Sequence, residues 1–319
     1  MLIAKVGNNN DAGPVETGKG TKEEPWVNVN TVFLNEKIQC YCKNFCCLYV
    51  RVIITGTVDY YLNGKGTDFY GKLILDFQTN LNYTYIRSPD DSKGISFYLI
   101  QNLKGVHFYN ININIYVANT TTESKGQVDI HFYCFSGCSY STFYNNTASV
   151  SMYNNVSGTG ANDHAALYFD YIINSNSVII IQTIVNADMQ AIGTETGDDD
   201  CPISHTRGAV ISNCSSSYII ACNFKLSCKS ISYDHVDKNS SYVTSIAQAF
   251  GIYNSRNCIL QDTNIDCSAA SVGQHYEYSY IACALGNPVT YKNCSFSSSS
   301  IRNKGTNNWT SSYSFSCNQ

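Results

Sequence analysis

Charged residues are scarce in this chain of 319 residues. Asp, Glu, Lys and Arg together make up 14% of the sequence, well below the roughly 25% of an ordinary soluble domain. The formal net charge of −4 offers no basic surface, so we expect neither nucleic acid nor an anionic membrane as a partner. No apolar run approaches the ~18 residues of a membrane span, which predicts that no segment inserts into a membrane.

Several functional signatures are also missing. The opening residues, MLIAKVGNNNDAG, contain one Lys and an apolar run too short for a signal peptide, so we predict no export by the usual route. The sequence has no glycine-rich phosphate loop, no nucleophile elbow and no His-Glu-x-x-His motif, and we therefore expect no cofactor.

Polarity comes instead from Asn, Ser, Thr and Tyr. The chain is 44% hydrophobic and contains 25 Tyr and 14 Phe. This composition allows a sizeable core and favours strands over helices.

Cysteine is abundant, with 15 residues. The odd count, the long chain and the absence of a signal peptide favour reduced thiols that pack as small hydrophobic groups. The motif Cys40-x-Cys42-x3-Cys46-Cys47 invites a metal hypothesis, but zinc sites need paired cysteines separated by a loop. The two-residue step from Cys40 to Cys42 instead indicates neighbours on one face of a strand, and we expect no metal.

A short pattern recurs along the chain. In the stretch 254–266, Cys258, Leu260, Thr263 and Ile265 are separated by two, three and two positions. A single strand would step by two throughout, and an amphipathic helix would repeat at three and four. The uneven step predicts two short strands joined by a bend.

About six copies of this pattern are present. Their first positions are 106, 138, 178, 220, 258 and 289, and several copies follow a polar turn that contains Asn, a residue suited to left-handed backbone. Such a period indicates coils that bury their apolar faces by stacking, with strands paired in parallel from coil to coil. Cys, Ser, Thr and Val would fill the narrow interior, and Asn at a bend would hydrogen-bond to Asn in the next coil.

The predicted fold is therefore all-β, a right-handed parallel β-helix with an N-terminal cap. The alternative, an antiparallel sandwich or barrel, needs turns every ~8–12 residues and hairpin dipeptides, of which Asn63-Gly64 is the one example. We predict an N-terminal strand or cap and first coil at 1–62, the β-helix at 63–300, and a C-terminal cap or tail at 301–319. The cysteine-rich segment 36–62 is expected to supply a helix or strand that closes the open coil end.

The N-terminal segment 8–32 resembles the opening of pectin-lyase-like β-helix proteins. The similarity lies in an Asn/Asp/Gly-rich loop, the step GTKEEPW at 20–26, and the apolar run that begins at Val27. That superfamily includes polysaccharide lyases, polygalacturonases and the tail spikes and fibres of bacteriophages. With no signal peptide and few charges, the chain looks most like a virion appendage assembled in the host cytoplasm. The resemblance implies a homotrimer that contacts other virion proteins and host cell-surface polysaccharide.

Two function classes follow. The first is a structural and binding appendage of a phage virion that contacts host glycan. The alternative is a β-helical polysaccharide depolymerase, either a lyase or a glycoside hydrolase. An extracellular adhesin is a third option, which the missing signal peptide disfavours.

The depolymerase hypothesis has four weak candidate residues: Asp188, Asp199, Asp200 and His205. Polygalacturonases carry Asn-x-Asp, then Asp-Asp with Cys, then Gly-His-Gly on successive coils, and segments 186–188 and 199–201 resemble the first two. Asp188 and Asp199 are too close in sequence to lie on stacked coils, and His205 has no flanking glycines. We interpret 193–208 as a solvated polar loop between two coils, with calcium binding by its acidic residues as a further option.

Carbohydrate binding has its own weak candidates in the Tyr-rich stretch 274–280. Tyr276, Tyr278 and Tyr280 are expected in a loop, where their rings could stack on sugars. A subunit interface explains the same residues equally well.

Overall fold

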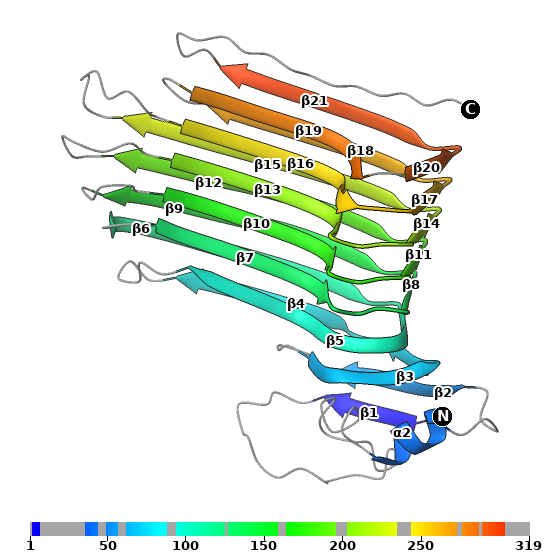
Figure 1. Ribbon diagram of the computed structural model, residues 1–319. Coiled ribbons are helices and arrows are strands. Elements are labelled where there is room, and N and C mark those ends of the chain that lie inside the picture. The colour runs from blue at the N-terminus through cyan, green and yellow to red at the C-terminus, as the bar shows by residue number, and fades with distance from the viewer. Residues whose placement is uncertain are drawn as a thin grey trace.

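In a computed structural model, the protein is a parallel β-solenoid of about five turns (Figure 1). The structure describes residues 2–6, 36–43, 49–56, 62–87, 94–124, 127–158, 164–195, 203–234, 244–272, 276–286 and 289–303. Strands account for 82% of these residues and helix for 3%. The predicted all-β fold of stacked parallel strands is confirmed, and the antiparallel alternative is wrong because the strands pair in parallel.

The N-terminal elements are β1 (Leu2–Val6), α2 (Glu36–Lys43), β2 (Val50–Gly56), β3 (Leu62–Phe77), β4 (Asn80–Arg87), β5 (Ile95–Tyr109) and β6 (Asn112–Ser124). The central elements are β7 (Gln127–Ser136), β8 (Thr142–Tyr144), β9 (Thr147–Gly158), β10 (His164–Ile173), β11 (Ile179–Ile181), β12 (Ile184–Glu195), β13 (Ile203–Ser212), β14 (Tyr218–Ile220) and β15 (Asn223–Asp234). The C-terminal elements are β16 (Thr244–Ser255), β17 (Cys258–Gln261), β18 (Asn264–Val272), β19 (Tyr276–Gly286), β20 (Val289–Lys292) and β21 (Ser295–Asn303).

Two sheets enclose the core. Each regular coil contributes one long and one short strand to a 14-stranded sheet, here sheet A, and one long strand to a 7-stranded sheet, here sheet B. The coil that begins with β10 and β11 in sheet A continues with β12 in sheet B and returns to sheet A as β13. β5 runs unbroken through the positions of both a long and a short strand, because it pairs with β7 and with β8.

The two-three-two pattern is a pair of strands joined at a tight corner, as predicted. In every regular coil, the residue just before the third patterned position has a left-handed backbone, with φ between 50° and 59°. These corner residues are Asn110, Asn145, Gln182, Ala221, Asp262 and Asn293. One residue in this conformation turns the chain from sheet A into sheet B, so the inward-facing side chains skip one position there.

Two of the six predicted copies were misplaced by three residues. The pairing of Ile180 with Phe143 and with Ile219 makes Ser141 and Ser217 the equivalents of Val178, in place of Cys138 and Ile220. Both serines are buried, and a search for apolar residues passes over them.

Ser, Thr and Cys alternate in the interior because each can accept a hydrogen bond at the corner. The backbone N–H of Cys138 donates to Ser175 Oγ at 2.9 Å, the N–H of Ser175 to Cys214 Sγ at 3.4 Å, and the N–H of Cys214 to Ser255 Oγ at 3.0 Å. Of the cysteines whose side chains are described, all but Cys40 are buried and all are free. Burial raises the pKa of the Cys138 and Cys214 thiols to about 12, so both stay protonated. The predicted packing role of cysteine is confirmed for these residues.

Asn ladders form on the outside of the corners, as expected. Asn145 Nδ2 donates to Asn110 Oδ1 at 2.8 Å, and Asn254 Nδ2 donates to Asn213 Oδ1 at 2.7 Å. Each bond joins one coil to the next in the direction of the stack.

The N-terminal region contains the short helix α2, which lies against β2 and β3 with Ile38 and Cys42 buried. The expectation that Cys40 and Cys42 lie on one face of a strand is wrong, because both belong to α2 and Cys40 is exposed.

Cys46, Cys47 and the segment 8–32 lie outside the described residues. The right-handed sense of winding, the capping role and the domain limits stay predictions. Within the described part of the chain, no helix is long and apolar enough to cross a membrane.

Candidate functional site

Outward-facing residues on the long strands of sheet A lie in columns that run along the stack. The strand register aligns Ser96, His131, Tyr168, Arg207 and Gln248 in one column, with one residue from each successive coil. A second column, two positions further along each strand, aligns Tyr98, Tyr133, Asp170, Ala209 and Phe250. Since side chains two apart share a face of a strand, both columns lie side by side on the outer face of sheet A.

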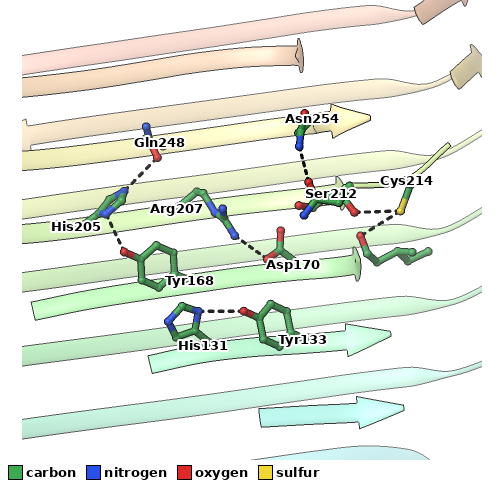
Figure 2. Close-up of polar contacts among 12 residues, drawn as sticks. His131, Tyr133, Tyr168, Asp170, His205, Arg207, Ser212, Cys214, Gln248 and Asn254 are labelled. Carbon is green, nitrogen blue, oxygen red and sulfur yellow. Dashed lines mark hydrogen bonds and ion pairs between the residues drawn. The ribbon is translucent and has the colours of Figure 1, made fainter. Parts of the chain in front are cut away.

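Aromatic and imidazole rings join three coils on this face (Figure 2). The rings of His131 and Tyr168 stack with centroids 4.3 Å apart and an angle of 13°. His131 Nδ1 lies 3.0 Å from the Tyr133 hydroxyl, and the Tyr168 hydroxyl lies 3.0 Å from His205 Nδ1.

Both ring nitrogens of His205 have hydrogen-bond partners. Its Nε2 lies 3.1 Å from Gln248 Oε1, an oxygen that can only accept. Nε2 therefore donates to this oxygen, and Nδ1 shares a hydrogen bond with the Tyr168 hydroxyl. His205 thus links β10, β13 and β16.

An ion pair lies beside this chain of rings. Arg207 Nη2 donates to Asp170 Oδ2 at 2.9 Å, with the Asp170 side chain fully buried and that of Arg207 19% exposed. The guanidinium carbon also lies 5.3 Å from the ring centre of Tyr168 and 5.1 Å from that of Tyr253, within range of cation–π attraction. Arg207 is thus held between two tyrosines and one carboxylate.

The carboxyl group of Asp170 titrates unusually high. Burial raises its pKa to about 6, and the Arg207 charge and the Ser212 hydroxyl offset part of this rise. The Ser212 hydroxyl does not reach hydrogen-bond geometry in this conformation, and Ser212 Oγ, Asp170 Oδ1 and Arg207 Nε are buried without a partner.

Burial also shifts the pKa of three other ionisable groups of the face. Burial lowers the pKa of His131, with Asp129 and Arg207 acting in opposite directions. Burial also raises the pKa of Tyr133 to about 12 and raises that of Tyr168. Beside the Arg207–Asp170 ion pair and the carboxyl group of Asp129, this part of the face presents hydrogen-bonding groups and ring faces.

A cavity adjoins the face at the coil formed by β5. Its volume is about 380 Å³, and its lining residues are Tyr83, Ser96, Phe97, Tyr98, Leu99, Gln101 and Phe132. The ring of Tyr98 lines the cavity and stacks on Tyr133 at 4.8 Å. A row of rings therefore runs from the cavity to Tyr168, and Arg207 links Tyr168 to Tyr253, which stacks on Phe250 at 4.8 Å.

The predicted catalytic candidates do not assemble into one constellation. Asp188 is exposed on β12 of sheet B, whereas His205 lies on β13 of sheet A. The interpretation of 193–208 as a loop is wrong at both ends, because β12 extends to Glu195 and β13 begins at Ile203. Asp199 and Asp200 lie outside the described residues, and a catalytic role for any of the four stays a prediction.

The predicted carbohydrate-binding tyrosines occupy a strand, and the expectation of a loop is wrong. Tyr276, Tyr278 and Tyr280 belong to β19, which continues sheet A next to β16. Tyr280 pairs with Gln248 and so continues the column of His131, Tyr168 and Arg207. Sugar binding by these residues stays a prediction.

Residues 131, 168, 170 and 207 were not among the sequence candidates. They are separated by whole coils, and the available signal was the register, which places His131, Tyr168 and Arg207 at equivalent positions. The described residues contain no group of three or more His, Cys, Asp or Glu side chains placed to bind a metal ion. Comparison of the chain with models of known protein families and with curated proteins finds no match.

Proposed function

We propose that this protein is a carbohydrate-binding β-solenoid, with the outer face of sheet A as its glycan-contact surface. In this proposal it serves as a tail spike or fibre of a phage virion, forms a homotrimer, docks onto other virion proteins and contacts host cell-surface polysaccharide. The chain acts by binding and not by catalysis.

The row of rings on sheet A carries this proposal. Across successive coils, Tyr98 stacks on Tyr133 and His131 stacks on Tyr168. The ring of Tyr253 lies against the guanidinium group of Arg207. Sugar rings present apolar C–H faces that pack on such rings, and sugar hydroxyls bond to the phenol, imidazole, amide and guanidinium groups between them. At ~4.8 Å per coil, the row from β5 to β16 is about 19 Å long, enough for several sugar units of a linear glycan.

The virion part of the proposal comes from the resemblance of the segment 8–32 to pectin-lyase-like β-helix proteins. A right-handed winding, a cap formed around α2 and side-by-side packing of three solenoids belong to the same proposal. Capsid and tail genes beside the gene for this chain would support the assignment. A neighbourhood of secretion and cell-wall genes would contradict it.

A binding experiment tests the glycan-contact surface. The intact protein is titrated by calorimetry with a panel of capsular and cell-wall polysaccharides, and we expect at least one to bind. Tyr168→Ala should weaken that binding at least tenfold, because it removes the central ring and the hydroxyl that bonds to His205. Tyr116→Ala is the matched control, because Tyr116 is 49% exposed on sheet B.

Two outcomes of this experiment would contradict the proposed glycan-contact surface. Absence of binding to every member of a broad panel would contradict the proposal. Equal losses in Tyr168→Ala and Tyr116→Ala would place the contact elsewhere on the solenoid.

One observation favours the alternative, a polysaccharide depolymerase. The pKa of Asp170 is raised to about 6, which suits an acid that donates a proton near neutral pH. Against this, the carboxylate is fully buried behind Arg207, whereas glycoside hydrolysis needs two carboxyl groups that reach the same bond. New reducing ends or unsaturated products, abolished by Asp170→Asn, would establish the depolymerase. Bound but intact polysaccharide supports the binding function.

A further inference from the structure

The narrow edge of the solenoid carries an exposed apolar surface that neither the fold nor the glycan face explains. It is made by the outward side chains of the short strands β8, β11, β14 and β17. We name this surface the edge stripe, and its residues are Tyr144, Ile179, Ile181, Tyr218, Ile220 and Ile259.

The strand register makes the stripe continuous. Ile179 pairs with Tyr218, and Tyr218 pairs with Ile259, so these three lie in one column. Tyr144, Ile181 and Ile220 form the second column. Large apolar side chains thus adjoin one another over four coils with no break between them.

The stripe is open to solvent. Tyr144 is 37% exposed, Ile179 38%, Tyr218 47% and Ile259 36%. Single exposed hydrophobic residues are normal on a soluble protein, but a contiguous patch marks an interaction surface.

The stripe carries no charge. The only other outward residues on these four short strands are Thr142 and Gln261. Sheet B differs, since its outward positions include Asp188, Lys225 and Asp266. A partner that placed a charged group on the stripe would bury that charge unpaired at a cost of several kcal/mol.

We propose that the edge stripe is a self-association surface whose partner is the same stripe of another copy of this chain, an inference that names the contact surface for the homotrimer of the proposed function. Two such stripes meet without burying any charge. Their side chains repeat at the same coil spacing, ~4.8 Å, so the ridges of one copy fit between those of the other along the whole contact. Contact through the short strands leaves the outer face of the long strands of sheet A free, and the inference stands whether or not those long strands bind glycan.

The area of the edge stripe determines how tightly two copies are expected to associate. Two columns ~7 Å apart over four coils cover on the order of 300 Å² per copy, against the ~800 Å² per partner of a standard interface. The neighbouring corners must therefore join as a polar rim. The exposed residues there include the uncharged Asn145, Asn174, Ser216 and the 64% exposed Tyr140, and the charged Arg256 and Asp262. We expect reversible association with a dissociation constant on the order of micromolar.

Sedimentation equilibrium over a range of concentrations tests the inference. The wild-type chain should show a mass that rises from 35.3 kDa to a multiple of it. Ile179→Lys combined with Tyr218→Lys should raise the dissociation constant at least 100-fold, because like charges would face each other across the contact. Tyr116→Lys, on sheet B, is the matched control and should associate like the wild type.

A more conservative double variant separates loss of association from loss of folding. Ile179→Thr with Tyr218→Thr places in both coils the residue that Thr142 already supplies in the same column, so the solenoid should keep its circular dichroism spectrum and melting temperature. We expect this variant to associate at least tenfold more weakly than the wild type. A wild-type chain that stays at 35.3 kDa up to several hundred micromolar, or folded variants that associate as tightly as the wild type, would overturn the inference.

Discussion

The outer faces of the two sheets share one backbone geometry but use it differently. On sheet A, Arg207 is held by two tyrosines and a fully buried carboxylate. On sheet B, Asn112 and Asn114 form exposed hydrogen bonds of 2.8 and 2.9 Å to Asn80 and Asn82 one coil before them. A polar ladder such as that of sheet B places few restrictions on the residue type at each position. The rings and charges of sheet A depend on specific neighbours one coil away, and for this reason we propose this face as the glycan-contact surface.

The largest expected contrast is between two cations on equivalent outward positions. Arg207→Ala should lower the free energy of unfolding by about 3–5 kcal/mol, because it leaves the buried Asp170 carboxylate uncompensated. Lys225→Ala on sheet B should change it by less than about 0.5 kcal/mol, because Lys225 is exposed. Urea denaturation followed by circular dichroism measures both, and similar losses would remove the distinction between the faces.

The next contrast is between two acids as pH changes. The folded-state pKa of Asp170 is about 6 against an ordinary 3.8, so the folded protein binds this proton more tightly than the unfolded chain. The resulting stabilisation is fully present below pH 3.8 and is lost as pH rises through about 6. Because each tenfold difference in proton affinity is worth ~1.4 kcal/mol, the loss is at most about 3 kcal/mol.

Paired variants isolate this effect. The lowered pKa of His131 acts with the opposite sign, since its stabilisation is lost as pH falls below its ordinary value of 6.5. The difference in unfolding free energy between the wild type and Asp170→Asn therefore reports Asp170 alone, and it should shift steadily from pH 4 to pH 7. Asp188→Asn, at an exposed position on sheet B, is the control for removal of a carboxyl group. A flat difference for Asp170→Asn would contradict the raised pKa.

A smaller effect is expected at the corners, which both sheets share. Cys214→Val keeps much of the side-chain volume but removes the acceptor of the buried Ser175 N–H, and should cost about 1–3 kcal/mol. Cys214→Ser keeps an acceptor of the kind that Ser175 and Ser255 already supply, and should cost less. Equal melting temperatures for the two variants would show that the thiol acts only by filling space.

The smallest effect is expected on the sheet B ladder. Asn114→Ala removes one exposed side-chain hydrogen bond and should lower the free energy of unfolding by less than about 0.5 kcal/mol. Thermal melts of Asn114→Ala and Arg207→Ala would compare the smallest and the largest expected losses of stability. A loss above about 2 kcal/mol would mean that the polar ladder holds the coils together.

The sequence was sufficient for the architecture because coil corners have strict steric needs. The step of two, three and two at Cys258, Leu260, Thr263 and Ile265 follows from one left-handed residue, Asp262, between two strands. The placement failed at Cys138 and Ile220 because the true inward residues, Ser141 and Ser217, are polar. Their hydroxyl groups are accommodated by hydrogen bonds within the stack, which a hydrophobic pattern cannot reveal.

The site was harder to predict because its residues never lie close together in sequence. Successive coils differ in length, with steps of 37, 39 and 41 residues along the ladder of Cys138, Ser175, Cys214 and Ser255. Without the correct register, His131, Tyr168 and Arg207 cannot be aligned. The local cluster of polar residues pointed instead to Asp199 and Asp200. Such a cluster gives no information on which residues of the neighbouring coils are aligned with it.

The buried corner ladder gives the solenoid a direction. In each of its bonds the backbone N–H belongs to the earlier coil and the accepting side chain to the later one, as for Val106 with Ser141 and Cys222 with Thr263. Every coil therefore has buried corner N–H groups that only the next coil can satisfy. Removal of the last coil would leave these N–H groups of the coil before it without acceptors, whereas removal of the first coil would not.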